Sequence, residues 1–227
     1  MKNIVSLLRA ACVVGVTVVL AACAPMKQKT AHADYKTFRA QAPHSILIVP
    51  VVNHSVDVDA PDYFLSTISR PIAERGYYVF PVNLVKKVMS DDGLSDADMV
   101  HQNDPTVLGK MFGADSILYI TIARWDSKYL VLNTTTTVEL DYVLKSGTTG
   151  ETLWKDHRHL AYSPKNNSSG NAIADLVVAA VQAAVEKAKP DYIPLARQAN
   201  GLSVYLSGTG LPAGPYDVRY QNDTAEY

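Results

Sequence analysis

Cysteine is almost absent from this chain of 227 residues. The two cysteines, Cys12 and Cys23, both lie within the first 23 residues, so the rest of the chain must be stable without disulfides. A body of roughly 190 residues is large enough to form its own hydrophobic core.

Motifs of the common enzyme and nucleic-acid-binding classes are missing too. The sequence has no Gly-x-Ser-x-Gly elbow, Walker loop, HExxH pair or CxxC pair. Removing residues 1–22 takes away Lys2 and Arg9 but no acidic residue, so the formal charge falls from −1 to about −3. Because a nucleic-acid surface needs clustered Lys and Arg, we expect no nucleic-acid partner. Because the catalytic motifs are missing, we also expect no catalytic activity and no cofactor.

A hydrophobic run long enough to span a bilayer is also lacking near the N-terminus. The uncharged stretch Ala10–Ala22 is shorter than the roughly 20 residues that a spanning helix needs. Basic residues precede it and small residues end it, which is the layout of a secretory signal. We therefore predict a signal peptide over residues 1–22 and disfavour a membrane-spanning helix.

The stretch Leu20-Ala21-Ala22-Cys23 matches the bacterial lipobox. It predicts a diacylglycerol on the Cys23 thiol and, after cleavage, an acyl chain such as palmitate on the new amine, which together anchor a protein stably. An ordinary secretory signal with a chance cysteine is the alternative. Because Ala24 rather than Asp follows the cysteine, we expect the outer membrane, with the body in the periplasm; surface exposure stays open.

The mature chain divides by composition into three parts. We predict a lipidated flexible tether over residues 23–42, a folded domain over 43–189 and a partly docked extension over 190–227. In the extension we expect a short docked helix over 193–198 and poor order in the last ten residues.

The first half of the domain predicts alternating strands and helices. Ser45–Val52 is an apolar, β-branched run typical of a buried strand, and helical spacing predicts a helix over 61–75. A second strand lies in "YYVFPV", and Pro105–Phe112 predicts a helix that Gly113 ends. This order indicates a partly parallel sheet that starts with a βαβ unit.

The second half predicts three antiparallel strands and a helix. The strand patterns cover residues 116–125, 129–144 and 151–162, with "DSK" joining the first two. Val138, Leu140, Tyr142 and Leu144 alternate with polar residues, which is typical of a sheet covered on one face. An Ala/Val-rich stretch then predicts a long C-terminal helix over 171–189. The fold class is therefore α/β, with a mixed sheet, a three-strand meander and this helix.

The sharpest polar cluster follows the first strand. Asn53, His54, Asp57 and Asp59 stand at the end of a parallel strand, where ligands commonly bind. They form a candidate ligand loop; a solvated loop with a helix cap is the alternative. His157 and His159 share one strand face, but zinc needs three or four ligands, so we expect no metal site.

Three segments carry a family resemblance: "ILIVPVVNHS", "GADSILYITIARW" and "LKSGTTGETLWKD". Over about residues 45–188 they resemble proteins with the fold of the TolB amino-terminal domain, and among them a family of small, uncharacterised, transport-associated outer-membrane lipoproteins. CsgG and LpoB are more distantly similar.

The resemblance implies a function without transferring any catalytic residue. It implies a non-catalytic accessory or scaffold protein of an envelope complex, related to transport or secretion, with a CsgG-like or transporter partner and a homodimeric state. A regulator of a peptidoglycan synthase, as LpoB suggests, and a small-ligand binding module are the alternatives.

Overall fold

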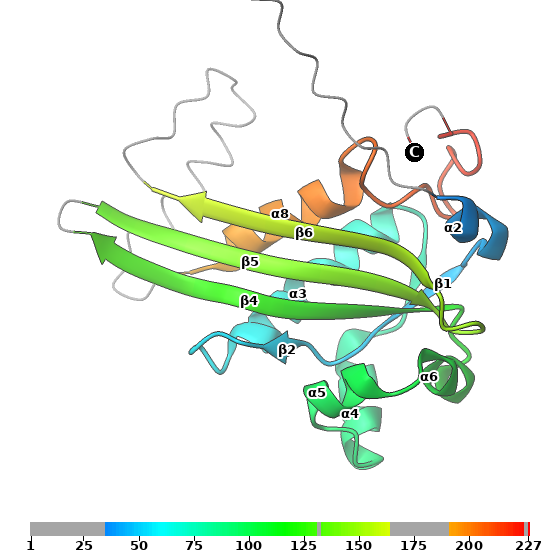
Figure 1. Ribbon diagram of the computed structural model, residues 1–227, viewed down its shortest axis with the longest axis horizontal. Coiled ribbons are helices and arrows are strands. Elements are labelled where there is room, and N and C mark those ends of the chain that lie inside the picture. The colour runs from blue at the N-terminus through cyan, green and yellow to red at the C-terminus, as the bar shows by residue number, and fades with distance from the viewer. Residues whose placement is uncertain (1–34, 131–132, 164–190, 225–226) are drawn as a thin grey trace, which may run out of the picture. The chain divides into compact units, whose positions relative to one another are not determined.

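The computed structural model describes residues 35–130, 133–163, 191–224 and 227 (Figure 1). Short helices and strands alternate in the first part, three long strands follow, and a helix and an irregular segment end the chain. In chain order the described elements are α2 (Lys36–Gln41), β1 (Ser45–Ile48), β2 (Val52–Asn53), α3 (Ala60–Glu74), β3 (Tyr78–Val79), α4 (Val82–Asp91), α5 (Ala97–Gln102), α6 (Pro105–Phe112), β4 (Ser116–Leu130), β5 (Asn133–Ser146), β6 (Thr152–Tyr162) and α8 (Ile193–Tyr205).

All six strands belong to one mixed sheet. Its order is β3-β1-β4-β5-β6, and β2 also pairs with β4. β1 is parallel to β3 and β4, whereas β4, β5 and β6 form an antiparallel meander. The predicted α/β class, with its βαβ start and three-strand meander, is thus confirmed. The helix predicted over residues 171–189 lies outside the described residues.

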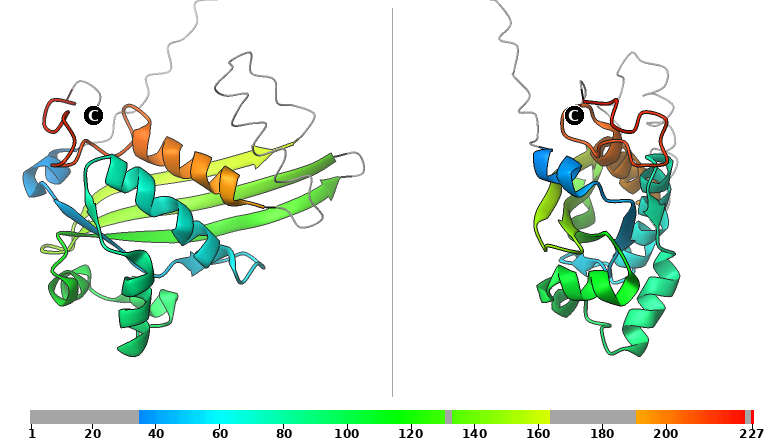
Figure 2. Two further views of the ribbon diagram at one scale, coloured as in Figure 1. Left: turned by 180° about the vertical axis from the view of Figure 1, so that it is seen from behind. Right: turned by 90° about the vertical axis from the view of Figure 1, so that its right-hand side faces the viewer.

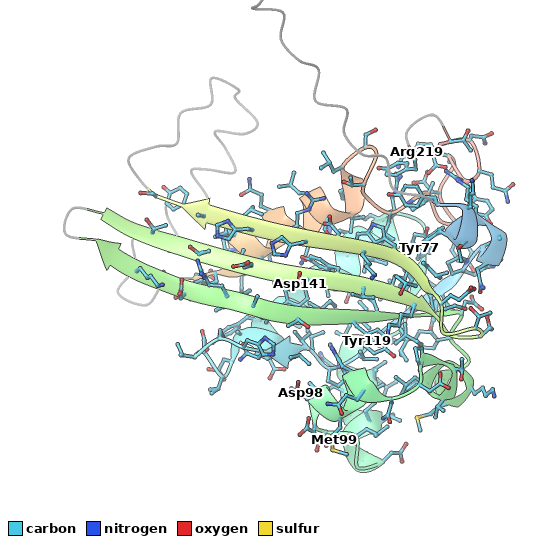
Figure 3. All side chains as sticks on the ribbon, viewed as in Figure 1. Tyr77, Asp98, Met99, Tyr119, Asp141 and Arg219 are labelled. Atoms are coloured by element: carbon cyan, nitrogen blue, oxygen red, sulfur yellow. The ribbon has the colours of Figure 1, made fainter. Side chains whose placement is uncertain are left out.

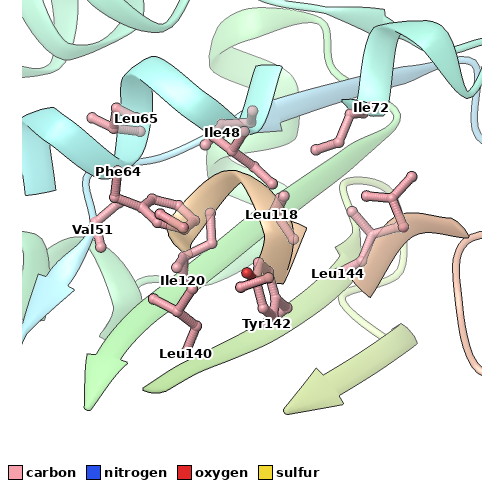
Figure 4. Packing of buried hydrophobic residues seen from close by; sticks show 14 of the residues in the cluster. Ile48, Val51, Phe64, Leu65, Ile72, Leu118, Ile120, Leu140, Tyr142 and Leu144 are labelled. Atoms are coloured by element: carbon pink, nitrogen blue, oxygen red, sulfur yellow. The ribbon is translucent and has the colours of Figure 1, made fainter. Parts of the chain in front are cut away.

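Two hydrophobic clusters lie on opposite faces of this sheet because successive strand residues point in opposite directions. Ile46 and Ile48 of β1 belong to the larger cluster, which α3 and α8 cover (Figures 2 and 4). Leu47 and Val49 belong to the smaller one, which α4, α5 and α6 cover. β1 is therefore buried on both faces, as its continuous apolar run predicts.

The meander differs from the prediction at its first turn. Asp126–Lys128 was expected to join two strands, yet β4 runs through it and pairs with β5 up to Leu130. The polar residues fit a strand because Ser127 hydrogen-bonds across to Thr136, with 2.7 Å between the two hydroxyl oxygens. When only the sequence is known, polar residues that hydrogen-bond to each other across strands are easily mistaken for a turn.

The folded body begins earlier than the predicted boundary at residue 43. Tyr35 and Phe38 are each only 4% exposed, and the Tyr35 hydroxyl donates a 2.5 Å hydrogen bond to the carbonyl oxygen of Gly210. Residues three apart share one face of a helix, so α2 buries both rings together. The end of the predicted tether is therefore part of the packed domain.

The C-terminal extension packs more extensively than predicted. α8 runs to Tyr205 instead of Gln198, and Leu211 and Ala213 after it are buried. Asp223, in the stretch expected to be poorly ordered, is 3% exposed. The sequence did not reveal that this carboxylate has a partner inside the domain.

Candidate binding sites

The predicted ligand loop is held together by the side chain of Asn53. Its Oδ1 accepts hydrogen bonds from the backbone N–H and the hydroxyl of Ser55, at 3.0 and 2.7 Å, and its Nδ2 donates to the Asp57 carbonyl oxygen at 2.8 Å. His54 donates its backbone N–H to Ile122 and its ring is exposed. The loop closes on itself in this way, and ligand binding there stays a prediction.

Asp59 fills the N-cap position of α3, as the alternative interpretation of this loop suggested. Its side chain makes no capping hydrogen bond; its backbone N–H instead donates to Asp57 Oδ1 at 3.0 Å. The loop also carries Val56 and Val58, which are 94% and 85% exposed. Singly exposed apolar side chains of this kind are common on protein surfaces and do not identify a binding site by themselves.

The two strand histidines lie on the sheet face away from α3 and α8. His157 Nδ1 is 2.7 Å from Asp141 Oδ1, and its Nε2 is 3.7 Å from Glu139 Oε1 (Figure 3). His159 pairs with Glu139 in the strand register. Across the described ranges, no group of three or more His, Cys, Asp or Glu residues is placed to hold a metal ion.

A buried polar network joins the opposite face of the meander to α3 and α8. The Tyr142 hydroxyl donates to Asn200 Oδ1 at 2.6 Å, and Asn200 Nδ2 donates to the Thr67 hydroxyl at 2.8 Å. Beside them Asp156 accepts from the hydroxyl of Ser203. Burial raises the pKa of the Asp156 carboxyl. Tyr142, Asn200 and Thr67 are buried and Asp156 is half-buried, and each is partnered, so the network fixes how the helices sit on the sheet.

A second polar cluster joins both ends of the described chain. The Asp223 carboxylate accepts from Arg39 Nη2 at 3.1 Å and from the Ala213 backbone N–H at 2.6 Å. Arg75 Nη2 lies 3.6 Å from it, and both of these side chains are 1% exposed. Arg75 also donates from Nε to the Leu211 carbonyl oxygen at 2.7 Å. We call Arg39, Arg75 and Asp223 the terminal clasp.

A pocket of about 180 Å³ opens beside the terminal clasp, between α2 and the C-terminal segment. Its lining contains Phe38, Pro43, Tyr77, Pro212 and Ala213, all buried, together with the more accessible Arg39, Ala42, Tyr220, Gln221 and Thr224. Tyr77 is fixed by a 2.7 Å hydrogen bond from its hydroxyl to the Pro212 carbonyl oxygen, and burial raises the pKa of this phenol. This pocket could not be predicted from the sequence because its walls come from three distant segments: residues 38–43, Tyr77 and residues 212–224.

A more polar groove of about 360 Å³ lies between α3 and α8. Arg70, Glu74, Arg197 and Tyr205 line it. Arg70 Nε is 2.7 Å from Glu74 Oε1, so these two charges largely neutralise each other at the groove's edge.

The sequence of this domain matches a family model over residues 33–216, described as "Putative lipoprotein GNA1162-like". The chain belongs to this family. The match begins just before Tyr35, the first described residue, and ends before the part of the pocket lined by Tyr220, Gln221 and Thr224. The resemblance to a lipoprotein family is confirmed.

Known relatives of this GNA1162-like chain come from Neisseria meningitidis. A curated relative from serogroup B (strain ATCC BAA-335 / MC58), "Putative lipoprotein NMB1124/NMB1162", is 33% identical over 211 residues, covering 92% of this chain and 97% of its own length. The crystal structure of lipoprotein GNA1162 matches with a TM-score of 0.53 and 33% identity, over 62% of this chain and 96% of that one.

A weaker likeness connects the GNA1162-like chain to the LpoB C-terminal domain from Salmonella enterica. The identity is 18% and the TM-score 0.37, over 55% of this chain and 90% of that one. A likeness of this size carries no argument about function. Among the described elements, no helix has the length and apolar character needed to cross a membrane.

Proposed function

We propose that this protein is a lipid-anchored, non-catalytic accessory or scaffold protein of an envelope complex related to transport or secretion. The observation that carries the proposal is membership of a lipoprotein family, together with the lipobox Leu20-Ala21-Ala22-Cys23. Lipid on Cys23 confines the domain to a membrane surface, which we take to be the periplasmic side of the outer membrane.

Confinement is the core of the proposed mechanism. Eleven residues, 24–34, separate Cys23 from Tyr35, and a fully extended chain spans at most about 3.3–3.6 Å per residue. The domain therefore works within about 36–40 Å of its anchor. This restriction raises its effective concentration near a partner in the same membrane, without requiring a large interface.

Exposed apolar side chains support a role in protein contacts. Val56 and Val58 project from the loop between β2 and α3, and Tyr216 and Val218 are 73% and 97% exposed in the C-terminal segment. We take these two pairs of side chains as candidate contact points for a partner protein. We also propose a homodimer, in which β6, an edge strand of the sheet, is available for pairing.

The anchor is tested by Cys23→Ser. This change should move the protein from the membrane fraction to the soluble fraction and abolish labelling by radioactive palmitate. The matched control is Cys12→Ser, which should change neither result because Cys12 lies within the predicted signal peptide. A Cys23→Ser protein that stayed membrane-bound would refute lipid anchoring.

The partner is tested by photo-crosslinking in intact envelopes, followed by mass spectrometry. The photoreactive residue is placed at Val58, and at the exposed Asp92 as a control on another surface. Transport or secretion components captured from Val58 but not from Asp92 support the proposal. A peptidoglycan synthase would favour the alternative of a synthase regulator, and crosslinks to itself alone would favour a self-contained homodimer.

The remaining alternative, a small-ligand binding module, has one specific observation in its favour. The pocket beside α2 has an apolar interior and a charged side chain in its wall, which is the usual composition of a ligand site.

A further inference from the structure

The pocket between α2 and the C-terminal segment has the size of a single aromatic ring. Its volume is about 180 Å³, and an apolar cavity of roughly 150 Å³ in another protein holds benzene. Phe38 and Tyr77 meet edge to face, with ring centroids 6.4 Å apart, and Pro212 and Ala213 complete the buried wall. Aromatic rings pack favourably against such walls.

Two guanidinium groups, Arg39 and Arg75, lie beside this pocket. Both face the Asp223 carboxylate, and the Arg75 and Asp223 side chains are almost fully buried. Arg75 Nη2 makes no hydrogen bond to the described residues. Among the described residues, Arg39 uses Nη2 for its bonds to both Asp223 and the Tyr227 main-chain oxygen, which leaves Nε and Nη1 as donors for another acceptor. An anion at the pocket mouth could accept hydrogen bonds from these two Arg39 nitrogens.

Backbone strain gathers at the same place. Within the described chain, the non-glycine residues with positive φ are Ala42, at 42°, and Gln221, at 60°, and both line the pocket. This conformation is unfavourable for residues with a Cβ and persists where surrounding structure enforces it, often at binding sites. Ala42 takes this conformation as the C-cap of α2, and Gln221 takes it in the C-terminal segment, so each of the two segments that bound the pocket contributes one such residue.

We propose that this pocket binds a compact aromatic carboxylate, with its ring packed against Phe38 and Tyr77 and its carboxylate on Arg39. The ring and the anion have two natural sources, a free aromatic acid or the C-terminal aromatic residue of a peptide. The inference does not depend on the lipid anchor or on the proposed scaffold role. Its failure would leave both of those intact.

The test is a ¹⁹F NMR titration of the purified full-length protein in detergent micelles. The probes are 4-fluorophenylacetate, a pentapeptide of four alanines ending in 4-fluorophenylalanine with a free carboxylate, and the same peptide with a C-terminal amide. We expect saturable binding of a carboxylate probe with a dissociation constant on the order of millimolar or lower.

The two peptides separate the contributions of ring and charge. A hydrogen bond to a charged group is worth about one factor of ten or more in affinity, so the amidated peptide should bind at least about tenfold more weakly than the free acid. Equal affinity of these two peptides would overturn the proposal, as would a lack of saturable binding by every probe. If 4-fluorophenylacetate binds with the same affinity as the free-acid peptide, a free aromatic acid is sufficient as the ligand. If the free-acid peptide binds tenfold tighter than 4-fluorophenylacetate, the ligand is the C-terminus of a peptide.

Substitutions at the mouth locate the site. Thr224→Trp places a large side chain at an exposed lining residue and should abolish saturable binding, leaving only partition into micelles. Asn222→Trp, two residues away, exposed and outside the pocket lining, is the matched control and should bind like the original protein. Binding that survives Thr224→Trp unchanged would refute the placement of the ligand.

A charge-removing variant and a charge-conserving variant together test the role of Arg39. Arg39→Gln should remove the preference for the free acid over the amide, and Arg39→Lys should retain part of it. Because Arg39 also belongs to the terminal clasp, the thermal midpoint of each variant is measured first. A preference that is unchanged in a folded Arg39→Gln protein would overturn the assignment of the anion to Arg39.

Discussion

Replacing Asp223 with alanine should strongly destabilise the domain. The substitution removes the carboxylate that faces Arg75 at 3.6 Å, and Arg75 is 1% exposed, so its buried charge would lose its ion-pair partner. Breaking a buried ion pair in this way costs about 3–5 kcal/mol, whereas a whole domain is stable by about 5–15 kcal/mol. For a domain of this size the thermal midpoint should fall by about 6–20 °C.

Urea unfolding followed by tryptophan fluorescence measures this loss directly. Trp125 and Trp154 are 1% and 4% exposed, so unfolding moves both from the core into water. The control, Asp91→Ala, removes an exposed helical ion pair to Lys87 and should change stability by no more than about 0.5 kcal/mol.

A double substitution distinguishes a buried charge from simple loss of packing. Adding Arg75→Met to Asp223→Ala removes the unpaired guanidinium and should recover part of the lost stability. Two results would contradict the reasoning about the terminal clasp. The first is a loss of less than about 1 kcal/mol in the free energy of unfolding of Asp223→Ala. The second is that Arg75→Met lowers the stability of the Asp223→Ala protein by as much as it lowers that of the original protein.

Two other regions give predictions of definite sign. Burial lowers the pKa of His101, whose Nε2 is 3.0 Å from the Pro50 carbonyl oxygen, so folding favours the neutral ring. The contribution of His101 to stability is complete above its unfolded pKa of about 6.5 and is lost as the pH falls below that value. In urea titrations at several pH values, His101→Gln should therefore lose less stability at acid pH than the original protein. Gly109→Ala should destabilise by about 1–3 kcal/mol in thermal unfolding, because a Cβ there would lie 2.2 Å from the Gly147 carbonyl oxygen. Gly201→Ala, in the open middle of α8, should instead stabilise by about 0.5–1 kcal/mol; a loss of stability would contradict the open space found there.

Periodicity predicted the elements whose burial follows one simple pattern. The alternation of Val138, Leu140, Tyr142 and Leu144 placed all four on one face, and each is at most 1% exposed. Pro105–Phe112 was predicted with its bounds as observed, because Pro at the start and Gly113 at the end are local signals. Such signals act within a few residues, so a single sequence reveals them.

The features that the sequence did not reveal depend on partners far along the chain. Asp156 and Arg158 alternate with His157 and His159, and nothing local tells which pair faces α8. Asp223 is buried by arginines 148 and 184 positions away, and the pocket needs the two ends of the domain together. The hydrogen bonds that close the candidate loop at Asn53 are visible only in three dimensions, and ligand binding there stays a prediction.

The terminal clasp also sets a mechanical length. Arg39 belongs to α2, the first helix of the described residues, and Asp223 holds that helix against the body. If the terminal clasp opened and α2 unwound, residues 35–42 would join the proposed tether and lengthen it by up to about 26–29 Å. If Cys23 carries the proposed lipid, a few residues at the far end of the chain would thus limit how far the body can move from its anchor.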